Sequence, residues 1–373
     1  RTFQMRIKLI ALLTAITIAA AAPARAGESA RDSVTQSYTT PSVTVTTTRA
    51  EERKNPVPFA EIDKAEITRH YTGRDLPQLL SELPSVMVFS EGGNGYGYSN
   101  LSLRGFHQRR ISVMVNGIPQ NDPEDHNMYS INMPDITSSL SSIQVQRGAG
   151  MAGYGSAAIG GSINLTTSNF AKERGALLTT GAAFQTFGEN DEIRHNATKY
   201  SLEVSSGMVD NYAVYGRLST INSFGYRADS WSKMQSYFLG FARFDDHFST
   251  QINVFGGPVA DALAYTGLPK SYIGDESLRR MNYNYWDYDS TGKNVNWTTS
   301  RRAREIENFS QPHYEMLNDW QVRDNITIKS SIFYYSGEGF FDFDGTGWTD
   351  ASTYQLNAAN GYPNAADPAN PII

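Results

Sequence analysis

The chain has no cysteine among its 373 residues, which excludes a disulfide framework and a thiolate metal site. Positive charge is not in excess either, and the formal net charge of −6 argues against a nucleic-acid partner. After residue 30 no apolar run reaches the roughly eighteen residues that a membrane-spanning helix needs. The strands of a transmembrane barrel alternate between polar and apolar residues, so the absence of a long apolar run does not exclude a barrel fold.

A catalytic constellation is also missing. The six histidines are scattered, and none forms the i, i+4 pair that binds zinc on a helix. The run Gly153–Ala157 lacks the glycine that a nucleophile elbow places two residues after its serine. No Gly-Lys-Ser/Thr follows the glycine-rich stretches, so none of them is a phosphate loop. We therefore expect no enzymatic activity, no cofactor and no resident metal.

The first 26 residues have the pattern of a secretory signal peptide. A basic start at Arg6 and Lys8 precedes an apolar core over 9–22, and Ala24-Arg25-Ala26 offers a small-x-small cleavage site. A buried amphipathic helix is the alternative interpretation. The pattern predicts export from the cytoplasm.

Residues 27–55 are rich in serine and threonine and poor in large apolar residues, a composition that does not favour independent folding. Within this segment lies a short β-prone run without a neighbouring partner strand. An unpaired strand on a flexible tether suits capture by strand addition, although an ordinary threonine-rich linker has a similar composition. The run consists of Ser42, Val43, Thr44, Val45 and Thr46.

Residues 56–168 are predicted to form one small mixed α/β domain, long enough for a modest core. Asp75 is a plausible N-cap for a helix over 75–83, with proline shortly inside it. Asn116-Gly117 predicts a turn. A glycine-dense turn inside 141–165 joins two alternating strands, where glycine permits positive φ and close approach. The other predicted elements are strands at 86–89, 100–104 and 111–115 and a short helix at 133–140.

From residue 175 onward the sequence alternates between apolar and polar residues, as strands with one wet face do. The connections between these strands run long, short, long, short, very long and short, and the longest covers 258–311. This arrangement favours an outer-membrane barrel over a soluble sandwich, although seven strands do not close such a barrel. The predicted strands are 175–188, 197–208, 211–222, 232–244, 247–257, 312–323 and 325–338.

Three stretches together resemble the plug domain of TonB-dependent outer-membrane receptors: Leu101–Phe106, Val113–Pro119 and Ser141–Leu165. The resemblance implies a mixed fold, with an α/β plug over 56–168 inside an antiparallel transmembrane β-barrel of 22 strands. Residues 169–373 would be the truncated start of that barrel. Segment 27–55 would carry the TonB box, at Ser42 to Thr46.

The resemblance implies active import of a substrate across the outer membrane of a Gram-negative type of cell. The plug would face the periplasm and the long loops would be extracellular. The implied partners are TonB with its inner-membrane energising complex, a small-molecule iron chelate, and outer-membrane lipid. A ferric siderophore is the first expectation for the substrate; haem, cobalamin and oligosaccharide are alternatives. A passive porin or adhesin barrel and a soluble periplasmic sheet protein are the competing classes.

Two plug loops are candidate ligand contacts, because family members bring such loops to the outer mouth of the barrel. In the first, Tyr96 and Tyr98 offer flat aromatic faces on a glycine-rich chain. The second is acidic and suits a hard cation or a cationic ligand, with a solvated loop as the alternative and an axial haem ligand as a further role for its histidine. Its candidate residues are Asp122, Glu124, Asp125 and His126.

The connection 258–311 is the third candidate region, because aromatic and arginine side chains interleave along it. Guanidinium groups and rings suit an anionic, partly aromatic chelate, although surface girdles also use such aromatics. The residues are Tyr265, Tyr272, Tyr283, Tyr285, Trp286, Tyr288, Trp297, Arg279, Arg280, Arg301, Arg302 and Arg304.

The resemblance also implies that Arg104 and Arg147 hold the plug against the barrel wall through carboxylates, since a buried arginine must be paired. This sequence departs from the family pattern at two nearby positions. Gln144 stands where an acidic residue is usual, and Asn116 replaces the usual aspartate before Gly117. Both departures weaken the transfer of those ion pairs.

Overall fold

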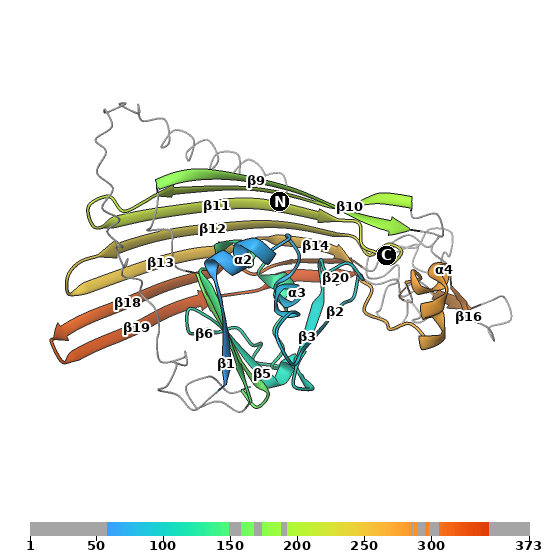
Figure 1. Cartoon of the computed structure of the whole chain (residues 1–373), viewed down its shortest axis with the longest axis horizontal. Coiled ribbons are helices and arrows are strands. Elements are labelled where there is room, and N and C mark those ends of the chain that lie inside the picture. Colours follow the sequence, from blue (N-terminus) through green and yellow to red (C-terminus); the bar gives the residue numbers. More distant parts are fainter. Residues whose placement is uncertain are drawn as a thin grey trace, which may run out of the picture. The chain divides into compact units, whose positions relative to one another are not determined.

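Long antiparallel strands carry a small α/β domain on one face (Figure 1). The computed structural model describes residues 58–148, 158–167, 174–187, 192–282, 284, 286–288, 295–297 and 306–342. All of them belong to one unit by their contacts, residues 40–373. The predicted signal peptide and the residues Ser42 to Thr46 lie outside the described residues.

Two small sheets form the α/β domain, which we call the plug. The first has the order β1-β7-β8-β5-β6, in which β5 and β8 are parallel, and the second has the order β2-β3-β4. The strands are β1 (Phe59–Asp63), β2 (Val86–Ser90), β3 (Ser99–Leu103), β4 (Phe106–His107), β5 (Ile111–Val115), β6 (Ile118–Pro119), β7 (Ser142–Arg147) and β8 (Gly161–Thr166). The helices are α2 (Lys64–His70) and α3 (Leu76–Leu80), with 3-10 turns at Gln108–Arg110, Ser130–Asn132 and Ile136–Ser139.

The core of the plug lies where the helices cover the first sheet. Ile67 of α2 and Leu80 of α3 are buried with apolar residues of the sheet such as Val113, Ile143 and Ile163. Because β5 and β8 are buried along their whole length, they tolerate apolar runs rather than strict alternation. No helix in the described part of the chain is long and apolar enough to cross a membrane.

The structure confirms the predicted plug strands and corrects both predicted helices. The helix expected over 75–83 ends at Leu80. The segment 133–140 forms a short 3-10 helix instead of an α-helix, because Asp135 adopts a left-handed conformation with φ of 53°. Strand β1 and helix α2 were not predicted.

The large sheet has the order β19-β18-β13-β12-β11-β10-β9, and β9 and β19 are its edges among the described residues. The seven predicted strands are confirmed to within a few residues. They are β9 (Arg174–Phe187), β10 (Glu192–Ser206), β11 (Tyr212–Ser223), β12 (Ser232–Phe244), β13 (Phe248–Gly256), β18 (His313–Arg323) and β19 (Ile326–Tyr335). The connection between β9 and β10 spans only 188–191, shorter than expected.

Three further strands extend the sheet beyond the predicted ones: β14 (Pro258–Ala262), β17 (Ile306–Ser310) and β20 (Glu338–Asp342). β14 pairs with β12 and β17, and β17 pairs with β20. The predicted loop 258–311 therefore contains strand at both ends. We call residues 263–305 the long connection. It includes a 3-10 turn at Lys270–Gly274, α4 (Glu276–Arg279), and β15 (Trp286–Tyr288) paired with β16 (Val295–Trp297).

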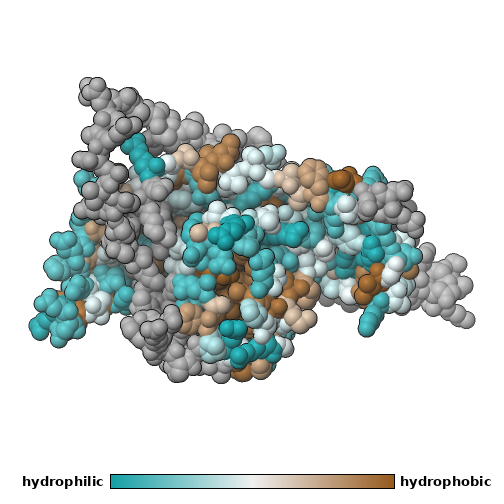
Figure 2. Space-filling view, in the orientation of Figure 1, coloured by the Kyte–Doolittle hydropathy of each residue, from teal (hydrophilic) through white to brown (hydrophobic). Residues whose placement is uncertain are grey.

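The predicted alternation places two kinds of residue on the two faces of the large sheet. Tyr200, Val214 and Ile332 are 54%, 52% and 66% exposed on the face away from the plug. Lys199 and Arg217 are buried on the face toward it. Figure 2 shows brown apolar patches mixed with teal polar ones over the visible side of the molecule.

Candidate functional site

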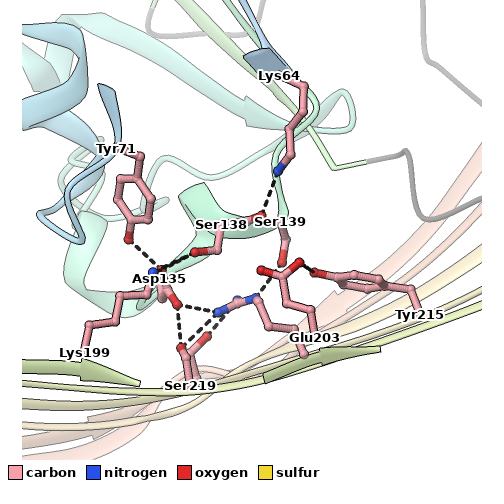
Figure 3. A network of polar contacts seen from close by, with 11 residues as sticks. Lys64, Tyr71, Asp135, Ser138, Ser139, Lys199, Glu203, Tyr215 and Ser219 are labelled. Carbon is pink, nitrogen blue, oxygen red and sulfur yellow. Dashed lines mark hydrogen bonds and ion pairs between the residues drawn. The ribbon is translucent and has the colours of Figure 1, made fainter. Parts of the chain in front are cut away.

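The plug is joined to the large sheet by a buried network centred on Asp135 (Figure 3). Asp135 follows Pro134 and precedes the 3-10 turn Ile136–Ser139. Its backbone is left-handed, and its carboxylate faces the strands. Its two oxygens accept five hydrogen bonds, two of them from cations. The donors are Tyr71 Oη (2.6 Å), Ser138 Oγ (2.7 Å), Ser219 Oγ (2.5 Å), Lys199 Nζ (2.6 Å) and Arg217 Nη1 (2.6 Å).

Arg217 is buried as completely as Asp135, with 1% of each side chain exposed. Its Nε donates to Ser139 Oγ of the plug at 2.8 Å, and its Nη2 donates to Ser236 Oγ of β12 at 3.0 Å. Lys199 also donates to Ser138 Oγ at 2.8 Å and lies 4.4 Å from the centre of the Tyr71 ring. Each cation therefore binds both the carboxylate and a plug hydroxyl, as a buried charge requires.

The electrostatics of the network keep Asp135 ionised. Burial alone would raise the pKa of Asp135, but the positive charges of Arg217 and Lys199 outweigh it and hold the pKa at about 2. Burial and the adjacent Asp135 carboxylate together raise the pKa of Tyr71, so its hydroxyl stays protonated and donates. The arrangement is an ionised carboxylate clamped between two cations on neighbouring strands.

Three further plug residues, Asn94, Tyr98 and Asn116, form hydrogen bonds with the strands. Asn116 Nδ2 donates to Glu315 Oε2 of β18 at 2.7 Å, and Glu315 also accepts from Asn253 Nδ2 at 3.1 Å. Asn94 Nδ2 donates to Asn196 Oδ1 at 2.6 Å and to Ser223 Oγ at 2.7 Å. Tyr98 Oη donates to Glu307 Oε2 of β17 at 2.6 Å. The attachment therefore runs from β10 to β18 rather than resting on one strand.

The two tyrosines proposed as ligand contacts face the strands. Tyr96 is 6% exposed and packs in a cluster with Ile131, Ile221 and Met234. Tyr98 donates a hydrogen bond to Glu307. Burial, and after it the negative charge of Glu307, raises the pKa of Tyr98 well above its usual value. A ligand role for either residue stays a prediction.

The acidic loop 122–126 uses its carboxylates for its own backbone and for neighbours. Asp122 Oδ1 accepts from the backbone N–H of Glu124 at 2.7 Å. Asp125 pairs with Arg109 at 3.1 Å and accepts from Tyr129 Oη at 2.9 Å. Burial is the largest single influence and would raise the pKa of Asp125, but the hydrogen bonds from Asn127 and Tyr129 and the Arg109 charge together lower the pKa.

Within the described ranges, no group of three or more His, Asp or Glu side chains is placed to hold a metal ion. His126 is exposed at the tip of the acidic loop, with a positive φ of 60°. The carboxylates of Asp122 and Asp125 are bonded within the loop and to its neighbours. The cation-binding and haem-binding roles stay predictions.

Two plug arginines, Arg104 and Arg147, were expected to hold the plug against the barrel wall. Arg104 is exposed in a turn with φ of 53°, and Arg147 is half-buried. The Nε atom of Arg147 is buried without a hydrogen-bond partner in the described part of the chain. Their role as wall contacts stays a prediction, while Asp135 and Asn116 make contacts of that kind.

Sequence reasoning did not single out Asp135, Lys199 or Arg217. The alternation did place Lys199 and Arg217 on the polar face of predicted strands, where a long charged side chain is unusual enough to be a signal. The sequence signal at Asp135 is weaker, because an aspartate at the start of a predicted helix is usually interpreted as its N-cap. The pairing itself spans 64 residues to Lys199 and 82 to Arg217.

Two of the predicted arginines of the long connection contact aromatic rings that lie outside it and were not predicted. The Phe187 and Tyr226 rings stack at 5.9 Å, and the guanidinium of Arg280 lies 4.3 Å from the Phe187 ring centre. Arg279 Nε donates to Tyr226 Oη at 2.7 Å. Tyr265 is 58% exposed. The residues outside the described part are Tyr283, Tyr285, Arg301, Arg302 and Arg304; of Trp286, Tyr288 and Trp297 only the strand backbone is described.

A cavity of about 320 Å³ lies beside the Asp135 network, between α2 and the strands β9 and β10. Small wall residues, Gly181, Ala183 and Ala197, leave this space open. Lys199 and Glu203 contribute charge to its lining. The cavity thus runs along the plug on one side of the polar attachment.

A plug seated on the inward face of long, alternating antiparallel strands is the architecture of plugged barrel receptors, and comparison with known proteins supports that class. Residues 51–162 match the family TonB-dependent Receptor Plug Domain. "Vitamin B12 transporter BtuB" of Vibrio vulnificus is 26% identical over 318 residues, covering 79% of this chain and 50% of that protein. The chain spans about half the length of the curated relatives that it matches over most of its own length.

Solved structures show the same fold. The unliganded ferric citrate transporter FecA superposes with a TM-score of 0.60 at 15% identity, covering 78% of this chain and 41% of FecA. The siderophore receptor PiuA of Acinetobacter baumannii gives a TM-score of 0.53 at 17% identity, with coverage of 77% and 37%. Residues 51–162 therefore carry the plug domain of TonB-dependent receptors, and the described fold, a plug with part of a barrel, is similar to that of these receptors.

Proposed function

We propose that the protein imports a scarce iron complex, a ferric siderophore in the first place, across the outer membrane. TonB and its inner-membrane energising complex would supply the work by pulling on the segment Ser42 to Thr46. The observation that carries the proposal is the Asp135 network. A barrel that imports its substrate needs a plug held by contacts that are strong but can be broken and formed again. Hydrogen-bonded ion pairs are contacts of this kind.

The strands support a position in a membrane, with the plug toward the periplasm and the long connection outside. Exposed aromatic side chains flank an apolar band on the face away from the plug, as in outer-membrane barrels. Tyr212, Phe248 and Trp320 lie near the short turns, and Phe184 and Phe224 lie near the opposite ends of the strands. If the full-length protein were soluble without detergent, this placement in a membrane would be overturned.

The choice of an iron chelate is supported by the arginine and aromatic side chains at the long connection. Arg279 and Arg280 lie against the Tyr226 and Phe187 rings, which suits an anionic and partly aromatic ligand. Two proteins of similar fold are a siderophore receptor and a ferric citrate transporter. Growth of a deletion strain on single iron sources tests the substrate, and full growth on every source would contradict the proposal.

Cobalamin import is a second candidate, because the sequence relatives that cover most of the chain are named vitamin B12 transporters. Uptake of labelled cobalamin by the same deletion strain, with and without the full-length gene, separates the two candidates. Dependence of cobalamin uptake on the gene, with iron uptake unchanged, would replace the first proposal by the second.

The TonB segment is tested by Val45→Pro in the full-length receptor, with Thr35→Pro as the matched control in the same segment. Proline removes a backbone donor, so strand addition at residue 45 should fail. We expect uptake to be lost and surface binding of the substrate to be retained, whereas Thr35→Pro should leave both unchanged. Normal uptake by Val45→Pro would reject the assignment and favour a passive porin or adhesin.

A further inference from the structure

Arg227 lies where three segments meet that are distant in the sequence. It belongs to the connection between β11 and β12, residues 224–231, which we call the bridge loop. The plug contributes residues 91–98, the plug loop that carries Tyr96 and Tyr98. The third segment is the described beginning of the long connection, residues 263–282.

The bridge loop is bonded to the plug loop mainly through its backbone. The carbonyl oxygen of Gly92 accepts from the N–H groups of Tyr226 at 2.8 Å and Arg227 at 3.1 Å, and from Ser230 Oγ at 3.4 Å. Gly93 adopts φ of +82°, and a Cβ placed there would lie 3.1 Å from the Cβ of Tyr226. The two loops therefore pack as closely as backbone and side chain allow.

The same arginine side chain holds the long connection by its carbonyl groups. Nε donates to Met281 O at 3.0 Å, Nη2 donates to Thr266 O at 2.9 Å, and Nη1 donates to Ala264 O. Nη1 also reaches Glu91 O of the plug at 3.5 Å, the longest of these contacts. Asn282 Nδ2 adds bonds to Ala228 O and Leu263 O, each at 3.0 Å.

We propose that Arg227 is a positioning residue that couples the long connection to the plug loop, so that the two segments become ordered or mobile together. A planar guanidinium presents donors in a rigid fork and reaches four carbonyl groups from one side chain, which a lysine ammonium with three donors on one atom does not reproduce. The coupling gives the proposed importer a route from its outer surface to Tyr96 and Tyr98. Its purpose rests on the proposed function, but its existence does not.

Coupling is reciprocal, so it is tested from both sides by hydrogen exchange on the ligand-free, full-length receptor. Arg227→Lys should accelerate amide exchange roughly tenfold in both the plug loop and residues 263–267, with β10 to β12 unchanged. Arg279→Lys, which loses only the bond to Tyr226 Oη, is the matched control and should leave the plug loop unchanged.

The reverse test is Gly93→Ala, which strains the plug loop and presses on Tyr226. It should accelerate exchange in residues 263–267 although it alters only the plug. Acceleration confined to the mutated segment in either variant would overturn the proposal. Because no substrate is present, the exchange measurements test the coupling whatever the receptor imports. The expected exchange changes in a receptor that takes up no iron complex would count only against the proposed function.

Discussion

At the scale of single residues, the attachment of the plug depends on where charge is buried. The plug contributes one carboxylate, Asp135, and the strands contribute the two cations. Removing one partner of such a buried group leaves the others unpaired, which costs far more than losing an exposed ion pair. The same residues therefore give the sharpest tests of how the plug is held.

Asp135→Asn should weaken docking of the plug by about 3–5 kcal/mol, because it leaves Lys199 and Arg217 buried without a carboxylate. Docking can be followed by maleimide labelling of Met234→Cys, a wall position that is 3% exposed, in urea. Asp125→Asn, which breaks the exposed pair with Arg109, should shift the labelling midpoint by less than about 1 kcal/mol. Equal shifts in both variants would contradict the assigned role.

Docking should also depend on acid in a defined window. The pKa of Asp135 is about 2 when docked and 3.8 in its ordinary state, so the docked state binds fewer protons. The stabilisation is fully present above about pH 4 and is lost as the pH falls toward 2, by an amount on the order of 2 kcal/mol. The labelling midpoint should show this fall in the wild type, and Asp135→Asn should show a smaller one. A wild-type midpoint that is flat from pH 5 to 2 would refute it.

Asn116 gives a matched test at the opposite end of the attachment. Asn116→Asp places a carboxylate against Glu315, 2.7 Å from the present amide nitrogen, and should weaken docking by about 1–3 kcal/mol at neutral pH. Glu315→Gln in the same chain should restore most of the loss, as a double-mutant cycle measures. Additive effects of the two changes would show that the pair does not interact.

At the scale of elements, one glycine determines how β13 continues into β14. A Cβ on Gly257 would lie 1.8 Å from the carbonyl oxygen of Gln235, and its φ is +153°. Gly257→Ala should therefore break the pairing of β14 with β12 and lower the yield of folded full-length receptor, measured by heat-modifiable gel mobility. Gly216→Ala is the control, because its Cβ meets only Leu239 at 3.8 Å. Normal folding of Gly257→Ala would reject the need for close approach there.

The elements that the sequence predicts well are those whose pattern is local. Alternation over about nine or more residues located β9 to β13, β18 and β19, since a period of two is set by neighbouring residues of the same strand. Short strands such as β14 and β20 carry too few alternating residues to be recognised, and α2 is only seven residues long. The prediction of a helix at 133–140 was wrong because Asp135 adopts a left-handed backbone. That conformation accompanies its contact with the strands, and the local sequence does not encode this contact.

At the scale of the whole molecule, the inward face of the sheet is polar under the plug. Its buried side chains include Lys199, Arg217, Gln251, Asn253 and Glu315. Full-length receptor lacking residues 56–168 should therefore conduct ions in planar bilayers, because those groups would line water instead of plug. The intact receptor is the control and should remain closed; an equally closed deletion variant would contradict this arrangement.

The three hydrogen bonds from the strands that converge on the Asp135 carboxylate have a mechanical consequence; their donors are Lys199, Arg217 and Ser219. A pull on the plug loads these bonds in parallel, so they share the force and none can yield alone while the rest stay intact. Such a joint is brittle: it resists up to a threshold and then fails at once. Departure of the plug from β10 and β11 would accordingly be an abrupt, single event, not a gradual slide.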